Sequence, residues 1–353
     1  MHREGFESVL GNRIQYAGTL AAAAAAVLFA VAGPAAAATG SASATALSLT
    51  GFSSIVADSV HGEVFISGAG SDPVAVTDFT GKSLGTLAAL DGATALALSR
   101  GDGILYAAIR GTDEIAAVNT ATLQEVAVYF TGSGYDPQHL AVVGTDIWFS
   151  YGGSGSAGIG VLDPAALSVS TSAESAFYYA PTLAASPSAP DMLVAGDVSA
   201  DPSVIESFDV STGAPVALAT SDPWSQSDGC ENLRQLAVAA DGTDVIAACG
   251  SPYYGSQLTL NGMTEDATYQ TGAYPASVAV APGSGAIALG VQGTNSTVDL
   301  FTPGDSNPTA SYQFAGTGVY GLAWNQTGSE LFAISTASTP TTSAPTLNVI
   351  DLS

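Results

Sequence analysis

Four short apolar runs separated by turn residues make up the segment LALSRGDGILYAAIRGTDEIAAVNTATLQEVAVYF, Leu96–Phe130. The first two runs, LAL and ILY, flank RGDG, whose Gly and Asp residues tolerate the positive φ of a tight hairpin turn. The third run ends at Asn119. The fourth run, VAVY, is flanked by more polar residues than the other three. The segment therefore predicts four antiparallel strands joined by short turns, which together form one small sheet.

The apolar-Ala-apolar pattern that opens this segment recurs along the chain. Copies begin at Leu96, Leu140, Leu183, Leu236, Val278 and Leu322, with a looser copy at Ile55. From Ile55 onward the spacings are 41, 44, 43, 53, 42 and 44 residues. A period in the forties that carries only β signals is typical of one propeller blade per repeat. The sequence therefore predicts an all-β fold, a seven-bladed β-propeller whose innermost strands carry small alanines.

The last repeat lacks a fourth strand, because the sequence stops at Ser353. A spare strand, Ala46–Thr50, precedes the first repeat. We expect it to pair with the last blade, which closes the ring and covers two exposed sheet edges. On this interpretation residues 46–353 form the propeller and residues 39–45 a short linker.

The same segment resembles the YVTN-type propeller repeats of secreted bacterial and archaeal surface proteins. It is similar to their "SPDG" turn, "YV" strand and "VID-T-T" hairpin, and related lactonase-like propellers share this pattern. The resemblance is good in the blade at Leu96, fair in those at Leu236 and Val278, and weak elsewhere. It implies a secreted seven-bladed propeller and says less about activity.

The N-terminal residues have the layout of a secretory signal peptide. Arg3 and Arg13 precede an apolar run over residues 17–32, and small residues lead up to Ala38. We expect cleavage after Ala38 and a protein that is secreted, extracellular or associated with the cell surface. A retained membrane anchor is the alternative, but the run is short and rich in alanine for a stable span. After cleavage we expect no membrane association.

Charge and cysteine content narrow the possible partners. The formal net charge is −25, with 6 Lys and Arg against 31 Asp and Glu, which argues against nucleic acid and against anionic lipid. The two cysteines, Cys230 and Cys249, are expected to form one disulfide in an exported chain. Two buried free thiols are the alternative. We expect a monomer without a cofactor or metal.

Candidate ligand-binding residues fall in the loops that link one blade to the next or join the second strand of a blade to its third. These loops should share one face of the ring, and exposed aromatic side chains there suit carbohydrate or protein contacts. The alternative is that the aromatics only pack between blades. The candidates are Tyr135, His139, Tyr179, Arg234, Tyr254, Tyr274 and Tyr320, with Trp224 further from the channel.

Catalytic candidates are few. His139 as a general base and Arg234 as a polariser of a carbonyl, with Glu231 beside it, would fit a lactonase-like hydrolase. The simpler interpretation is that His139 stacks beside Tyr135 and that Arg234 pairs with Glu231. The sequence therefore favours a non-enzymatic extracellular module that binds a surface glycan or a protein. A lactonase-like hydrolase and a passive surface or scaffolding protein are the alternatives.

Overall fold

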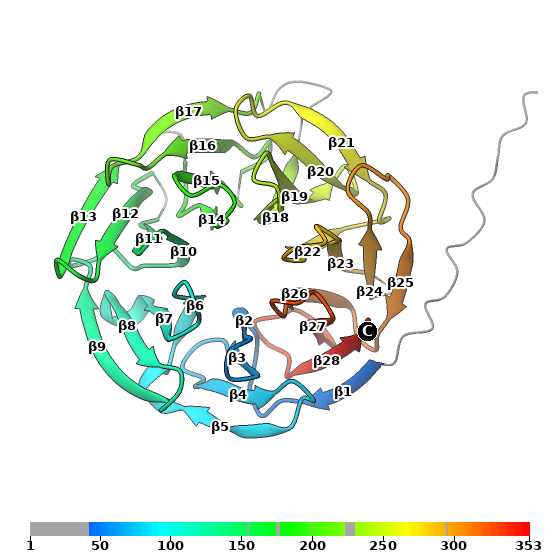
Figure 1. The fold of residues 1–353 in the computed structure, drawn as a ribbon, viewed down its shortest axis with the longest axis horizontal. Helices are drawn as coiled ribbons and strands as arrows, with labels where there is room; N and C mark the ends of the chain where they lie inside the picture. The colour runs from blue at the N-terminus through cyan, green and yellow to red at the C-terminus, as the bar shows by residue number, and fades with distance from the viewer. Residues whose placement is uncertain (1–41, 154, 174–176, 199, 223–229, 294–295) are drawn as a thin grey trace, which may run out of the picture. The chain divides into compact units, whose positions relative to one another are not determined.

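Seven four-stranded antiparallel sheets follow one another around a ring and enclose a central channel (Figure 1). This computed structural model describes residues 42–353 except 154, 174–176, 199, 223–229 and 294–295. The expected signal peptide at 1–38 lies outside the described residues. Each sheet is one blade. In six blades the strands run in sequence order from the channel to the rim, and in the seventh β1 takes the outermost place, so the predicted seven-bladed β-propeller is confirmed.

The strands of blades one to three are short and regular. They are β2 (Ser54–Asp58), β3 (Glu63–Ser67), β4 (Val74–Asp78) and β5 (Ser83–Leu87); β6 (Ala93–Leu98), β7 (Ile104–Ile109), β8 (Glu114–Asn119) and β9 (Gln124–Phe130); and β10 (His139–Val143), β11 (Asp146–Tyr151), β12 (Gly158–Asp163) and β13 (Ser168–Ala173). Two 3₁₀ turns, η1 (Ala88–Leu90) and η2 (Arg110–Thr112), lie between strands.

Blades four to seven repeat this arrangement. They are β14 (Thr182–Ala184), β15 (Met192–Gly196), β16 (Ile205–Asp209) and β17 (Val216–Thr220); β18 (Glu231–Val238), β19 (Asp244–Ser251), β20 (Tyr254–Thr259) and β21 (Glu265–Tyr269); β22 (Pro275–Val280), β23 (Ile287–Val291), β24 (Thr297–Phe301) and β25 (Ala310–Gln313); and β26 (Gly318–Trp324), β27 (Glu330–Thr336) and β28 (Pro345–Asp351) with β1 (Ala42–Ala46).

Each copy of the apolar-Ala-apolar pattern lies in the innermost strand of a blade, as predicted. The innermost strands are β2, β6, β10, β14, β18, β22 and β26. Polar side chains on these strands also link neighbouring blades: Ser54 Oγ accepts a hydrogen bond from the Leu96 amide at 3.2 Å, and Gln235 Oε1 accepts one from Val278 at 3.0 Å. The small alanines leave room for seven strands to crowd around one axis.

The ring closes as expected, but the closing strand begins earlier than predicted. β1 covers Ala42–Ala46, not Ala46–Thr50, and pairs antiparallel with β28 from Ala42↔Ile350 to Ala46↔Thr346. β1 therefore occupies residues expected to form the linker. The apolar residues of the predicted strand have another role: Leu47 and Leu49 are buried in a cluster with Phe332 and Leu347.

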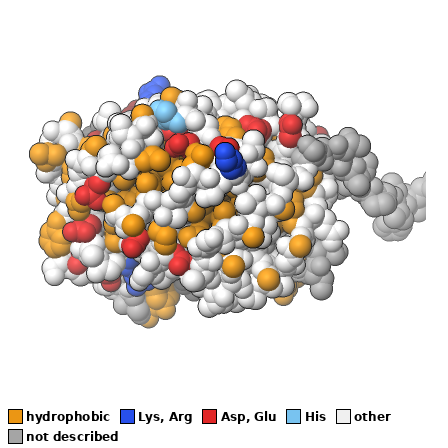
Figure 2. Space-filling model, turned by 90° about the horizontal axis from the view of Figure 1, so that it is seen from below, with side chains coloured by type: hydrophobic (Ala, Val, Ile, Leu, Met, Phe, Trp, Pro, Cys, Tyr) orange, Lys and Arg blue, Asp and Glu red, His pale blue; other side chains and the backbone are white. Residues whose placement is uncertain are grey.

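The hydrophobic core lies between the blades and consists of one cluster at each of the seven blade interfaces. The cluster between blades one and two, for example, joins Phe65 and Val76 to Leu105 and Ala107, all buried. Because each blade packs through both faces of its sheet, the middle strands are apolar at most positions and not only at every second one. The rim is mixed instead, and Figure 2 shows hydrophobic and acidic side chains interspersed on the side that carries β5 and β9.

Strand order gives the ring two different faces. Connections between blades, and between the second and third strands of a blade, lie on what we call the loop face. Hairpin turns between first and second strands, and between third and fourth strands, lie on the turn face. Cys230 and Cys249, both on the loop-face side of blade five, form the predicted disulfide with a Cα–Cα distance of 5.3 Å.

Candidate functional site

A chamber of about 240 Å³ opens at the loop-face end of the channel. Three predicted site residues from three different blades line it: His139, Arg234 and Tyr320. Its other described lining residues are small, apolar or uncharged polar side chains: Phe52, Ser53, Ser54, Ile55, Thr94, Ala95, Leu96, Leu140, Thr182, Leu183, Gln235, Leu236, Ala276 and Gly321. The described residues of this lining include no carboxylate, although the chain has a net charge of −25.

His139 begins β10 and lies half-buried at the chamber wall. Burial lowers the pKa of its imidazole to about 4, because the charged form loses hydration that no partner replaces. The ring is therefore neutral at neutral pH and can donate one hydrogen bond and accept another. A base with this pKa is weak, since general-base catalysis is most effective when the pKa is near the working pH.

Arg234 lies in β18 with an exposed side chain, and it supplies the fixed positive charge of the chamber. The expected pairing with Glu231 is not present: among the described residues the structure records no ion pair for Arg234. Glu231 instead accepts a hydrogen bond from Ser251 Oγ at 3.0 Å. The guanidinium thus remains open to a ligand carboxylate, which it can bind through two parallel hydrogen bonds.

Tyr320 reaches the same chamber from β26 of the last blade. Burial raises the pKa of its phenol, and a hydrogen bond with Thr317 and the charge of Arg234 partly oppose this shift. The hydroxyl therefore stays protonated at neutral pH and can donate a hydrogen bond. Arg234, Tyr320 and neutral His139 together offer donors to an anion, and no described residue of the lining carries a negative charge.

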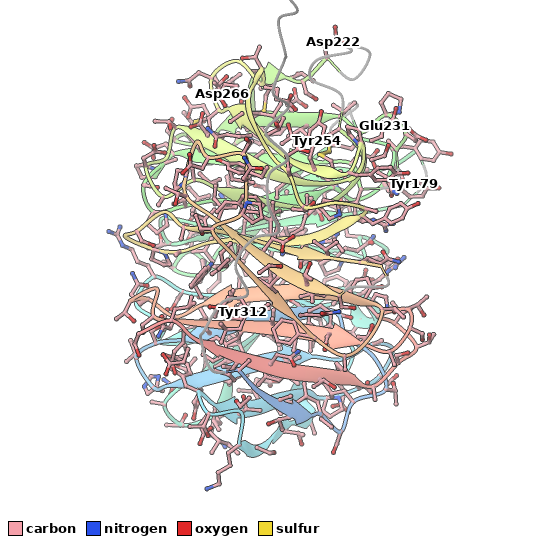
Figure 3. The ribbon with its side chains drawn as sticks, turned by 90° about the vertical axis from the view of Figure 1, so that its right-hand side faces the viewer. Tyr179, Asp222, Glu231, Tyr254, Asp266 and Tyr312 are labelled. Atoms are coloured by element: carbon pink, nitrogen blue, oxygen red, sulfur yellow. A yellow bond between two sulfur atoms is a disulfide. The ribbon has the colours of Figure 1, made fainter. Side chains whose placement is uncertain are left out.

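Two pairs of exposed tyrosines lie on the loop face on either side of Arg234. Tyr178 and Tyr179 precede blade four, with ring centroids 4.8 Å apart in an edge-to-face arrangement. Tyr253 follows the second strand of blade five, and Tyr274 precedes blade six, with centroids 5.0 Å apart. Their exposed fractions are 53%, 38%, 45% and 44%. Figure 3 shows Tyr179 and Glu231 at the same edge of the ring.

The backbone under this surface is held in unfavourable conformations. Tyr253 has φ 77°, Tyr274 has φ 64° and Asn232 has φ 57°, all in the left-handed region. This region is uncommon for non-glycine residues and costs about 1 kcal/mol or more for a bulky side chain. A hydrogen bond to Tyr274 also raises the pKa of the Tyr253 hydroxyl. The second pair is therefore held in place by its surroundings, as is common at binding surfaces.

Three other predicted residues do not join this arrangement. Tyr135 packs edge-to-face against Tyr151 with ring centroids 4.6 Å apart, and its hydroxyl accepts a hydrogen bond from Thr171 Oγ1. It therefore packs between blades two and three and not against His139. Tyr254 is half-buried in β20 opposite Cys249. Trp224 lies outside the described residues.

Sequence reasoning missed most of the polar chamber lining, including Ser54, Thr182 and Gln235. A positional signal could have found them. The residue immediately before the apolar-Ala-apolar pattern lines the chamber in six of the seven blades: Ser54, Ala95, His139, Thr182, Gln235 and Gly321. Residues at equivalent positions of a repeat lie at equal depth in the channel, so these six residues form one ring around it.

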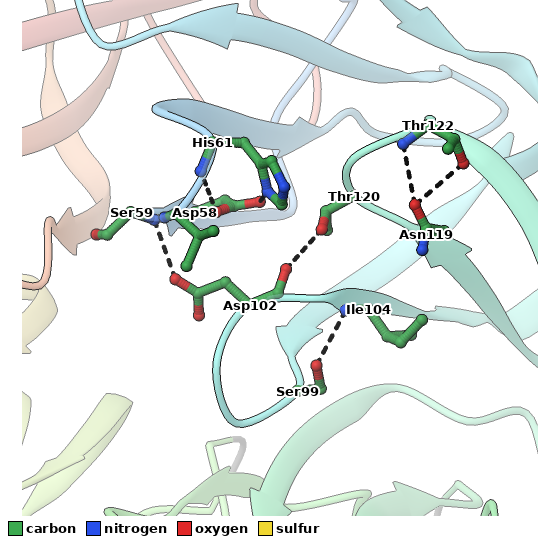
Figure 4. Close-up of polar contacts among 10 residues, drawn as sticks. Asp58, Ser59, His61, Ser99, Asp102, Ile104, Asn119, Thr120 and Thr122 are labelled. Atoms are coloured by element: carbon green, nitrogen blue, oxygen red, sulfur yellow. Dashed lines mark hydrogen bonds and ion pairs between the residues drawn. The ribbon is translucent and has the colours of Figure 1, made fainter.

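The turn face is rigidified by hydrogen bonds among its own residues (Figure 4). Asp58 is fully buried and accepts bonds from the amides of Val60 and His61 at 2.8 and 2.9 Å, and its other oxygen lies 2.7 Å from His61 Nδ1. Asp102 Oδ2 accepts from the Ser59 amide at 3.0 Å. These acids are occupied by the turns themselves, which leaves little for a partner to contact.

Two larger cavities open from the channel toward the turn face. One of about 540 Å³ is lined mainly by Ala, Val and Leu of the inner strands, and one of about 800 Å³ extends over the turns of blades one to four and blade seven. Leu140, Leu183 and Leu236 line both the first of these and the loop-face chamber. The loop-face end of the channel is thus lined by polar and charged side chains, and three leucines follow. The cavity beyond them is lined mostly by Ala and Val, with Ser186, Ser188 and Gln326 at its mouth.

Two further features of the described part of the chain concern metal binding and membrane crossing. It holds no group of three or more His, Cys, Asp or Glu side chains that could bind a metal ion. It also contains no helix of the length and hydrophobicity needed to cross a membrane.

Comparisons with known proteins support the architecture. No protein-family model matches the sequence, and no curated protein matches it. Among solved structures, U3-55K superimposes with a TM-score of 0.69 at 13% identity, covering 88% of this chain and 98% of that one. Hydrazine synthase of Kuenenia stuttgartiensis gives 0.62 at 17% identity, covering 82% and 94%. At such identities the similarity shows the fold alone, and the YVTN-type family remains a resemblance of the sequence.

Proposed function

We propose that this protein is a secreted, non-enzymatic binding module whose working surface is the loop face between blades four and six. The observation that carries the proposal is the open Arg234 guanidinium flanked by two exposed tyrosine pairs. Flat aromatic rings with hydroxyl tips bind sugar rings and protein surfaces, and tyrosine and arginine are enriched at binding hot spots. A disulfide is compatible with an extracellular location.

The surface fits an acidic ligand best. The chain carries a strong excess of negative charge, yet the described residues around Arg234 in the chamber include no carboxylate. A carboxylate on the ligand would therefore meet one cation and neutral donors, whereas a basic ligand would be attracted to other parts of the surface. A surface glycan with acidic sugars is the partner that this combination of tyrosine and arginine favours, and a protein with an exposed acidic segment is the alternative.

A glycan array probed with the mature protein tests this proposal. We expect retention of acidic glycans, and we expect Arg234→Gln, Tyr179→Ala and Tyr274→Ala each to weaken binding by roughly 30-fold, the effect of a typical hot spot. Arg110→Gln is the matched control, because Arg110 is exposed in η2 on the loop face but does not line the chamber. Binding that survives all three substitutions would refute the proposal.

A lactonase-like hydrolase is the competing proposal, and His139 with Arg234 in one chamber is the observation in its favour. Against it, the imidazole is a weak base, and Glu231 is bonded to Ser251 and does not line the chamber. A lactone screen of the purified protein distinguishes the two. Turnover that Arg234→Gln or His139→Gln abolishes would establish the hydrolase, and a passive scaffold would give neither turnover nor glycan retention.

A further inference from the structure

We infer that the central channel binds a monocarboxylic acid with an unbranched apolar chain, its carboxylate at Arg234 and its chain along the inner strands. The inference rests on the proposed role of Arg234 as an anion contact, and it adds the class of compound that the channel itself can hold. It depends on where polar and apolar side chains line the channel. The four exposed tyrosines of the loop face are not part of this lining.

The head-group position is defined by the loop-face chamber. Arg234, Tyr320 and neutral His139 approach it from blades five, seven and three, so donors surround the chamber from several sides. A carboxylate leaving water needs such partners, because an unpaired charge is strongly disfavoured away from solvent. The absence of acids among the described lining residues removes the repulsion that most of this surface would impose.

The position of the ligand's alkyl chain is defined by the adjoining cavity, which is lined mostly by apolar side chains. Leu140, Leu183 and Leu236 belong to both linings, so the two spaces meet at these side chains. Beyond these leucines the wall is built mainly from valine and alanine side chains, such as Val142, Val238 and Val280, around about 540 Å³. Polar side chains at its turn-face mouth are Ser186, Ser188 and Gln326. This volume is in the range of small-molecule sites, which are mostly apolar with a few placed polar groups.

The dimensions agree with an extended chain. Arg234 and Val238 lie on the same strand, β18, four residues apart, and Arg234 occupies a bulge between Leu233 and Gln235. At roughly 3.3 Å per residue, less the shortening at the bulge, the two are about 10 to 13 Å apart along the strand. A chain anchored at Arg234 and running parallel to β18 therefore reaches the apolar cavity. Each methylene moved there from water gains about 0.8 kcal/mol, or roughly a fourfold change in Kd.

The test is calorimetric titration of the disulfide-bonded mature protein with butanoate, octanoate and dodecanoate below their micelle-forming concentrations, and with octanol as the uncharged probe. We expect Kd to fall roughly fourfold per methylene until the channel is filled, and we expect octanol to bind at least tenfold more weakly than octanoate. Arg234→Gln should remove that difference, while Arg110→Gln should not.

A second variant tests where the alkyl chain of the ligand lies. Ala185→Leu narrows the channel where the two turn-face cavities meet, and it should weaken dodecanoate more than butanoate. Ala166→Leu, at an exposed turn position, is its control. Short acids that bind through Arg234 without any chain-length dependence would overturn the inference and leave the proposed function standing. Failure of every acid to bind would overturn it as well, and glycan binding through the tyrosines would then still support the proposed function.

Discussion

Arg234 of blade five and Tyr320 of blade seven line one chamber, although blade six separates their strands along the ring. The positive charge of Arg234 lowers the pKa of the Tyr320 phenol against the larger, opposite effect of burial. The two side chains therefore act on a common space, and an anion placed there contacts both a cation and a hydroxyl donor.

Tyr320→Phe should weaken binding of an acidic ligand about three- to tenfold, the loss expected for one hydrogen bond. The ring still packs, so the melting temperature should stay nearly unchanged. Titration of the variant with a ligand retained by the glycan array measures this. Tyr312→Phe, in the outer strand β25 and away from the chamber, is the control, and an equal loss in both variants would contradict a role for the Tyr320 hydroxyl.

Loss of the closing strand should destabilise the propeller strongly. A chain that starts at Leu47 lacks β1 and its five paired positions on β28, whereas a chain that starts at Thr39 keeps them. At about 1 kcal/mol per hydrogen bond, roughly five bonds correspond to a decrease of about 10 °C in melting temperature. Equal melting temperatures for the two chains would show that β1 does not hold the ring closed.

The disulfide should contribute about 3 kcal/mol, because it closes a loop of 19 residues in the unfolded chain. Replacing both cysteines by serine should lower the free energy of unfolding in urea by this amount. A thiol titration of the unfolded, unreduced protein should detect no free thiol. Two free thiols, or an unchanged unfolding midpoint in the double variant, would contradict the crosslink.

Asp299 makes stability depend on pH. Burial raises the pKa of this carboxyl to about 6 from 3.8, although hydrogen bonds with Ser311 and Thr297 favour the charged form. The folded state holds this proton more tightly than the unfolded state, so stability from Asp299 is present below pH 3.8 and is lost as pH rises through 6.

Asp299→Asn should therefore raise the free energy of unfolding at pH 7.5 by up to about 3 kcal/mol, and the gain should vanish near pH 3.5. His139 works in the opposite direction, since its folded pKa of about 4 removes stability as pH falls below its ordinary 6.5. Because Asp299→Asn leaves His139 unchanged, the difference between the two proteins reports the contribution of Asp299 alone. Urea unfolding of both proteins at the two pH values checks this, and a gain of equal size at both would contradict the assignment.

Much of the architecture follows from the sequence because inner strands have a distinctive pattern. An alanine between two larger apolar residues, repeated about every 43 positions, has few explanations besides a ring of crowded strands. The closing strand was harder to place. Its sequence, ASATA, is small and exposed, whereas Leu47 and Leu49 show the alternation of a strand yet pack as an irregular buried segment.

The site could be predicted only in part. His139 and Arg234 stand out because the chain has only 3 His and 6 Lys and Arg, and Tyr320 stands out by its place just before an inner-strand repeat. The structure brings the three together. Tyr135 could not be separated from the exposed tyrosines, since its packing against Tyr151 depends on tertiary contacts. The apolar cavity was missed because alanines and valines that line a channel look the same in sequence as those that fill a core.

Hydrogen–deuterium exchange with and without a bound ligand tests most directly whether the loop face is the working surface. The probe is an acidic glycan retained by the array. The account predicts slowed amide exchange at residues 177–179, 231–234, 253–254 and 272–274, with little change in the turns at 59–61, 99–102 and 240–243. Protection confined to those turns, with the loop-face amides unchanged, would contradict it.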